Sequence, residues 1–257
     1  MSSALCQTFK ELATDTFRLI SHSRAVAYQL KEESFTDFNL IRLKIMHPDE
    51  VKIKAFTRIE EGVTGADWEW WLGDQYNRWI GFRVQAKIIA AEADEFKHLH
   101  YKGKASIPQC EKLILQAAAN PTYPCIPLYC LYLTRSPGAG LPGSDVPLYG
   151  CSLLSAFKVR GHRAAGETRL SILWPDLKPW HTLVCFGDQQ SFSDHIIRQA
   201  TNYFLADDNA SGQYLLTEPP PYVQQLLNSD SGQIDLPAKS LDLAGVMILR
   251  QEQKRPR

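Results

Sequence analysis

The sequence lacks the features that mark several large protein classes. Its 257 residues contain no apolar run of the roughly 18 residues that a membrane-spanning helix needs, and charged residues interrupt the N-terminal stretch where a signal peptide has its apolar region. It also lacks a glycine-rich loop of the P-loop or Rossmann type, which argues against an NTPase or a dinucleotide-dependent enzyme. We therefore expect a cytoplasmic protein outside these classes.

Net charge and closely spaced cysteines are lacking as well. The 28 Lys and Arg residues balance 28 Asp and Glu residues, so no overall positive charge attracts nucleic acid. The six cysteines form no C-x-x-C pair and lie mostly among apolar residues, so we expect reduced core residues and neither a zinc site nor a disulfide framework. A nucleic-acid partner would have to bind through local basic segments.

The composition that is present belongs to a globular protein, with 44% hydrophobic and 22% charged residues. Helical spacing of apolar residues predicts helices at 3–21, 34–47, 106–120, 150–159, 193–206 and 221–229. Alternation or short apolar runs predict strands at 51–57, 125–133 and 243–250. These elements predict a mixed α/β fold with helices packed against a small sheet.

The segment 134–147 is rich in proline and glycine and is the clearest boundary in the chain. We expect a core over residues 1–135. Residues 136–257 are expected to form a mostly helical C-terminal extension packed on that core.

The stretch TGADWEWWLGDQYNRWIGFRVQAK, residues 64–87, predicts two antiparallel strands joined by a turn near Tyr76. In that register Asp67 lies opposite Gln85, and alternation divides the hairpin into two faces. One face carries Asp67, Glu69, Arg83, Gln85 and Lys87, and the other carries Trp68, Trp70, Phe82, Val84 and Ala86. The apolar face is expected to pack on helices, and the polar face is either a solvent-exposed surface with a Glu69–Arg83 ion pair or a functional site.

An acid before one strand and a (D/E/Q)-x-K triplet on the next resemble the PD-(D/E)xK nuclease superfamily, in the variant with Gln in place of the second acid. Asp67 and the triplet Gln85, Ala86 and Lys87 carry this resemblance, although Ala66 stands where the motif has proline. The order of helix, three-strand meander, helix and strand over residues 25–135 is also similar to the core of that superfamily. The resemblance implies a restriction-endonuclease-like mixed sheet flanked by helices. In addition, TGADWEWW with VQAK is similar to an uncharacterised bacterial family of this length.

The resemblance implies a metal-dependent nuclease that hydrolyses phosphodiester bonds, with DNA as the expected substrate, RNA as the alternative, and bacterial restriction or anti-phage defence as the setting. Asp67 would be the metal-binding acid, and Gln85 would be the second ligand through its side-chain oxygen. Ala86 would add its backbone carbonyl to this Mg²⁺ or Mn²⁺ site. Lys87 would orient or deprotonate the attacking water and neutralise charge on the phosphate.

The upstream helix glutamate of the superfamily corresponds to Glu33, with Glu32 and Asp37 as alternatives. The basic loop FKHLHYKGK fits a phosphate-contacting surface, although a solvated loop is the alternative interpretation. The residues expected to bind nucleic acid are Lys97, His98, Lys102 and Lys104. By resemblance only, Gln109 and Lys112 are expected to face the site, and a homodimer is expected by analogy.

Two other classes of function stay open. The first is a catalytically silent nuclease-fold module that binds nucleic acid or a protein partner. The neutral net charge favours this module, and it equally favours an enzyme that needs an activating partner protein. The retention of Asp67, Gln85 and Lys87 favours catalysis. The second is a structural protein whose polar hairpin face is simply exposed to solvent. A Cys/His/Asp hydrolase is disfavoured, because no candidate nucleophile is placed at an elbow or a helix start.

Overall fold

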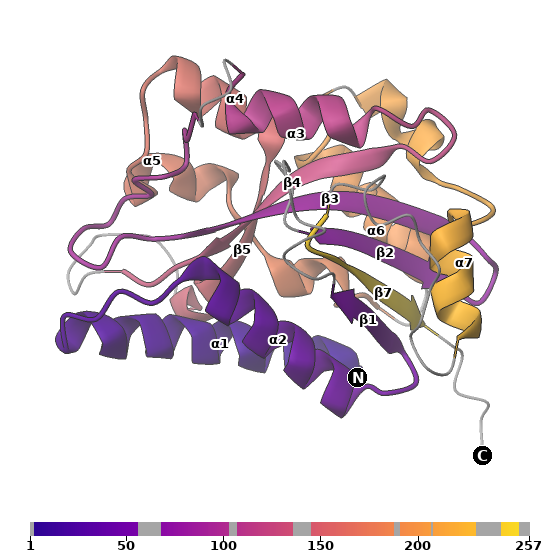
Figure 1. Ribbon diagram of the computed structural model, residues 1–257, viewed down its shortest axis with the longest axis horizontal. Coiled ribbons are helices and arrows are strands. Elements are labelled where there is room, and N and C mark those ends of the chain that lie inside the picture. Colours follow the sequence, from indigo (N-terminus) through magenta and orange to yellow (C-terminus); the bar gives the residue numbers. More distant parts are fainter. Residues whose placement is uncertain are drawn as a thin grey trace.

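The computed structural model describes residues 3–55, 68–102, 107–135, 145–187, 191–206, 208–229 and 243–251, and within them seven α-helices surround a seven-stranded mixed sheet (Figure 1). The helices are α1 (Ala4–Ala25), α2 (Glu32–Met46), α3 (Gln109–Ala117), α4 (Ala156–Ala164), α5 (Leu170–Leu173), α6 (Phe192–Tyr203) and α7 (Pro221–Asn228). The strands are β1 (Val51–Ala55), β2 (Trp68–Asp74), β3 (Trp79–Ile88), β4 (Cys125–Tyr132), β5 (Cys151–Ser155), β6 (Lys178–Pro179) and β7 (Gly245–Gln251). The expected α/β class is confirmed. None of the helices described is long and apolar enough to cross a membrane.

The prediction of one helix over 150–159 is wrong in its first half. Cys151–Ser155 forms the strand β5, which is buried along its whole length between β4 and β6, and helix α4 begins only at Ala156. A short apolar run that is buried on both faces has no periodicity by which a strand can be told from a helix. The Ser155 hydroxyl accepts a hydrogen bond from the Phe157 amide and thereby caps α4.

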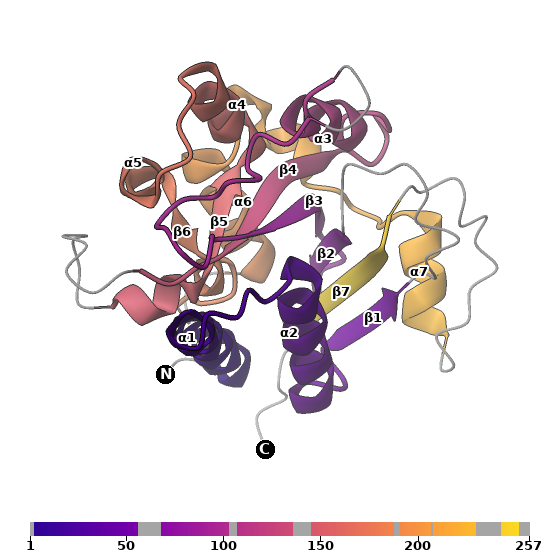
Figure 2. The ribbon, with the colours of Figure 1, turned by 60° about the vertical axis from the view of Figure 1, so that its left-hand side comes forward.

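The strands follow the order β1-β7-β2-β3-β4-β5-β6 across the sheet. The expected meander of three consecutive strands is therefore wrong at one point, because β7 lies between β1 and β2 (Figure 2). It pairs antiparallel with β1 and parallel with β2, and its apolar residues suit a strand that is buried on both faces. Strands from both sides of the segment 134–147 thus join a single sheet.

The β2–β3 hairpin has the register that its sequence predicts. Trp68 pairs with Val84 and Trp70 pairs with Phe82, as expected for a turn near Tyr76. The apolar face packs as expected, since the Trp70 ring lies 6.5 Å from the ring of Trp180, centroid to centroid. The predicted pairing of Asp67 with Gln85 stays a prediction, because residue 67 lies outside the described part of the chain.

Trp71 fixes the close approach of the two hairpin strands. Its ring lies over Gly81 on β3, where an added Cβ atom would come within 2.5 Å of the indole. Only glycine leaves room for the ring at that position. The Trp71 indole nitrogen donates hydrogen bonds to Glu69, 3.0 Å away, and to Tyr222 on α7, 3.1 Å away.

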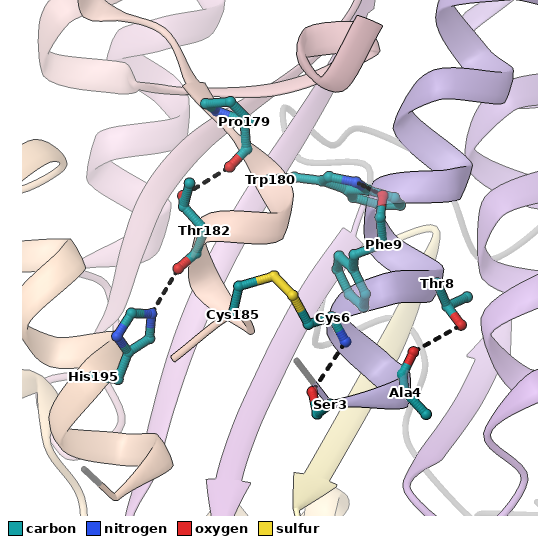
Figure 3. Close-up of a disulfide and its surroundings, with 10 residues drawn as sticks. All are labelled: Ser3, Ala4, Cys6, Thr8, Phe9, Pro179, Trp180, Thr182, Cys185 and His195. Atoms are coloured by element: carbon teal, nitrogen blue, oxygen red, sulfur yellow. Dashed lines mark hydrogen bonds between the residues drawn. A yellow bond between two sulfur atoms is a disulfide. The ribbon is translucent and has the colours of Figure 1, made fainter. Parts of the chain in front are cut away.

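The expectation that all cysteines are reduced is wrong for one pair. Cys6 on α1 forms a disulfide with Cys185, which follows the short 3₁₀ helix Trp180–Leu183 (Figure 3). The two residues are 179 positions apart in the sequence, so spacing alone could not predict their pairing. Beside the disulfide, the Trp180 indole donates to the Phe9 carbonyl at 2.7 Å. The other four cysteines are free and buried, as expected.

Candidate functional site

The polar face of the hairpin is buried and not exposed to solvent. Arg83, Gln85 and Lys87 alternate along β3 with exposed fractions of 8%, 2% and 6%. Long charged side chains are rarely buried to this degree unless they are paired. The interpretation of this face as a wet hairpin surface is therefore wrong.

The inner part of this face holds the expected cross-strand ion pair. Glu69 pairs with Arg83 in register, and their charged groups lie 3.9 Å apart. Glu69 also accepts hydrogen bonds from Trp71 and from the Tyr222 hydroxyl, and Arg83 donates to the Gln116 carbonyl at the end of α3 at 3.3 Å. This pair is enclosed between α3 and α7, so we assign it a structural role.

Lys87 lies at the outer part of the same face and contacts the start of α2. Its Nζ atom is 3.5 Å from Oε1 of Glu32, the first residue of that helix. Burial raises the pKa of the Glu32 carboxyl, and the attraction of Lys87 offsets only part of that effect. Both Glu32 and Glu33 stand in the first turn of α2, where carboxylates interact favourably with the helix dipole.

The structure therefore separates the three candidates for the upstream glutamate. Glu32 contacts Lys87. Glu33 is exposed and lies on the surface of the pocket into which Lys87 extends. Asp37 lies further along the helix and is absent from that surface. Glu33 stays a prediction as the upstream glutamate of the superfamily, whereas its neighbour Glu32 is the carboxylate that contacts Lys87.

Hydrogen bonds hold the side-chain amide of Gln85 beside Lys87. Gln109, the first residue of α3, donates from Nε2 to Gln85 Oε1 at 2.6 Å, and Gln85 Nε2 donates to the Ala86 carbonyl at 3.2 Å. The expectation that Gln109 faces the site is confirmed, whereas Lys112 is absent from the surface around it. The Oε1 atom of Gln109 is buried and has no hydrogen-bond partner within the described part of the chain.

These side chains line a pocket of about 630 Å³ between α2, β3 and the loop that follows β3. Its buried members are Gln85, Lys87, Ile89 and Ala90, and the exposed members at its rim are Gln29, Lys31, Glu33, Glu92, Lys97, His98 and Tyr101. Intermediate positions belong to Leu30, Glu32, Ile88 and Gln109. The pocket therefore has a polar interior, partly apolar walls and a rim on which Lys31, Lys97 and His98 stand beside the acidic Glu33 and Glu92.

The residues predicted to bind nucleic acid differ in their position relative to the pocket. Lys97 and His98 line the rim, and Lys97 is paired there with Glu92. Lys102 is exposed but absent from the lining, and Lys104 lies outside the described residues. Lys31 and Tyr101 also line the rim, although their sequence pattern does not point to them, and Tyr101 lies within the basic loop FKHLHYKGK.

The donor set for a metal ion is incomplete in the described part of the chain. No group of three or more His, Cys, Asp and Glu side chains is placed there to hold an ion. The oxygen-bearing side chains that line the pocket interior are those of Glu32, Gln85 and Gln109, and the Ala86 carbonyl accepts a hydrogen bond from Gln85. Mg²⁺ and Mn²⁺ prefer this kind of oxygen donor, and the partnerless Gln109 oxygen could accept such a contact. Asp67, the expected principal ligand, lies outside the described residues.

Comparison with known proteins identifies one family. Its sequence model, described as "Family of unknown function (DUF6615)", matches residues 5–255. The expected similarity to an uncharacterised family is confirmed, because this match covers most of the chain. No curated protein and no solved structure matches the chain.

Proposed function

Because the chain belongs to the DUF6615 family, whose function is unknown, we propose a function from the pocket itself: a metal-dependent nuclease that hydrolyses phosphodiester bonds in DNA. The observation that carries this proposal is the buried Lys87 ammonium, held by Glu32 beside Gln85 inside an open pocket. A buried lysine that can reach a bound ligand supplies fixed positive charge where a phosphate gains negative charge during hydrolysis. Such a charge is stronger in a site that excludes water than it is in bulk solvent.

The arrangement of elements supports a restriction-endonuclease-like core. Helix α2 brings Glu32, the β2–β3 hairpin brings Gln85 and Lys87, and α3 brings Gln109. This is the chain order of the PD-(D/E)xK core, with β7 added between β1 and β2. We therefore propose that the chain has a restriction-endonuclease-like core.

The metal site would use oxygen ligands from three segments. Asp67, Gln85 and the Ala86 carbonyl would hold Mg²⁺ or Mn²⁺, with a carboxylate from Glu32 or Glu33. When bound, the metal supplies a water of lowered pKa and offsets charge on the phosphate. Gln109 positions Gln85 through its 2.6 Å hydrogen bond, and Glu32 holds Lys87 in place before a phosphate arrives. Lys87 then exchanges this carboxylate for the phosphate oxygens.

A second candidate is a catalytically silent module that binds nucleic acid or a protein partner. Two observations favour it: Lys87 and Gln85 already have protein partners, and no cluster of three metal-binding side chains exists in the described part of the chain. Such a module would bind through the rim residues Lys31, Lys97 and His98 without cutting. A defence or restriction setting, a homodimer and an activating partner protein all stay predictions.

The test is cleavage of supercoiled plasmid and of circular single-stranded DNA with Mg²⁺, with Mn²⁺ and with EDTA. The wild type is compared with Asp67→Ala, and with Asp49→Ala as a control for loss of one carboxylate outside the pocket lining. We expect metal-dependent cleavage that Asp67→Ala abolishes and Asp49→Ala preserves. Absence of cleavage of both DNAs with either metal would favour the silent module. Cleavage that persists in Asp67→Ala would show that the site is misplaced.

A further inference from the structure

The inner groups of the pocket are less accessible to a double helix than its rim is. Its volume is about 630 Å³, and the side chains of Lys87 and Glu32 are only 7% and 24% exposed. A duplex carries its phosphates on a broad convex surface, so those phosphates would meet the exposed rim and not the inner lysine. Enzymes that receive a nucleobase inside a pocket take it from a single strand or extrude it from a duplex.

The walls of the pocket suit a nucleobase as well as a phosphate. Leu30 and Ile88 are partly exposed and supply apolar surface in the wall of the pocket, next to the less exposed Ala90. Tyr101 is 55% exposed at the rim, where its ring is accessible to a ligand. Proteins that bind single strands combine aromatic rings, on which bases stack, with basic groups that contact the backbone.

The basic groups are placed for that second role. Lys31 directly precedes α2, whereas His98 and Lys97, which is paired with Glu92, belong to the loop after β3. A strand that crosses the opening would pass between these side chains while one nucleotide enters the pocket. The exposed face of Tyr101 offers stacking without reading base edges, so little sequence preference is expected.

We infer that the pocket takes a single strand of DNA, with one unpaired nucleotide inserted so that its base stacks on Tyr101 and its phosphate reaches Lys87. This inference names the substrate class of the proposed nuclease and rests on that proposal for the cleavage step only. Binding of the strand is a separate property of the pocket. The two can therefore fail independently.

Fluorescence anisotropy in EDTA tests the binding directly. The probes are a labelled oligodeoxythymidine of about 16 nucleotides, a blunt-ended hairpin duplex of equal length and an oligouridine. We expect the oligodeoxythymidine to bind at least about tenfold more tightly than the duplex. Tyr101→Ala is expected to weaken single-strand binding about tenfold, within the range measured for loss of one stacked base, whereas Tyr101→Phe retains it.

The matched control is Tyr76→Ala, because Tyr76 is 63% exposed in the β2–β3 turn and is absent from the pocket lining. Equal or tighter binding of the duplex, or equal effects of Tyr101→Ala and Tyr76→Ala, would overturn the inference. Tighter binding of oligouridine would overturn its assignment to DNA. Single-strand binding through Tyr101 without cleavage of any DNA would support the inference and contradict the nuclease proposal. Cleavage of relaxed plasmid as fast as circular single-stranded DNA would support the nuclease proposal and contradict the inference.

Discussion

The ammonium group of Lys87 lies 3.5 Å from the carboxylate of Glu32, although the two residues are 55 positions apart in the sequence. This contact joins the end of the β2–β3 hairpin to the first turn of α2 and forms one side of the pocket. Neither group is fully exposed, so each depends on the other for compensation of its charge.

Loss of the lysine should therefore destabilise the protein. Lys87→Met retains the apolar stem but leaves Glu32 without its cation, and we expect the free energy of unfolding to fall by about 2 kcal/mol. Chemical denaturation measures this change. The control is Lys44→Met, near the other end of α2, where the lysine donates to the Pro48 carbonyl. Equal effects of the two substitutions would contradict the importance of the pair.

The raised pKa of Glu32 predicts a pH dependence of stability. Burial raises the pKa of this carboxyl above its ordinary value of 4.5, so the folded state binds the proton more tightly than the unfolded state does. The stability that this group contributes is fully present below pH 4.5 and is lost as pH rises through the folded-state pKa. Relative to wild type, Glu32→Gln should therefore gain stability as pH rises over that window.

The measurement is denaturation of the wild type, Glu32→Gln and Glu33→Gln at several pH values from about 4 to 8. Glu33 is the matched control, because it is the next residue on α2 and is exposed. A stability difference between wild type and Glu32→Gln that stays constant with pH, or that changes in the opposite direction, would refute the assignment.

Gly81→Ala should disrupt the hairpin. The new methyl group would come within 2.5 Å of the Trp71 ring, and overpacking of this kind costs about 1–3 kcal/mol. Gly161→Ala is the control, since its added Cβ on α4 meets no atom within 4 Å and alanine favours the helix. Thermal unfolding should therefore show a lower melting temperature for Gly81→Ala and an unchanged or higher one for Gly161→Ala. Equal shifts would contradict the close contact.

The Cys6–Cys185 disulfide should be detectable as a loss of free thiols. Titration in denaturant without reductant should find four thiols, which belong to Cys110, Cys125, Cys130 and Cys151. Reduction should lower the stability by about 2–4 kcal/mol, because the cross-link restricts the unfolded chain. A variant with both Cys6→Ser and Cys185→Ser should not respond to reductant. Six thiols in the oxidised protein would show that the bond does not form.

Local patterns were sufficient for much of the fold. Periodicity predicted α1 and α3, and the turn near Tyr76 predicted the β2–β3 register over its described residues. These features depend on residues that are close in the sequence. The wrong assignment of Cys151–Ser155 shows the limit, because burial on both faces removes the periodicity of a strand.

Long-range features could not be predicted in the same way. The position of β7 between β1 and β2, and the pairing of Cys6 with Cys185, depend on how the whole chain folds. In the site, the motif residues Gln85 and Lys87 were predicted to share a face, and both line the pocket. The choice between Glu32 and Glu33 depended on where α2 begins and how it is rotated, which periodicity defines only to within a residue or two.

The most direct test of the central claim is the rate at which wild type and Lys87→Met cleave labelled single-stranded DNA in Mg²⁺, with Lys44→Met as the control. Removal of a group that stabilises charge on the reacting phosphate should slow cleavage by about 100-fold or more, while both variants remain folded and Lys44→Met cleaves at the wild-type rate. Cleavage by folded Lys87→Met at the wild-type rate would contradict the assignment of this pocket as a nuclease centre.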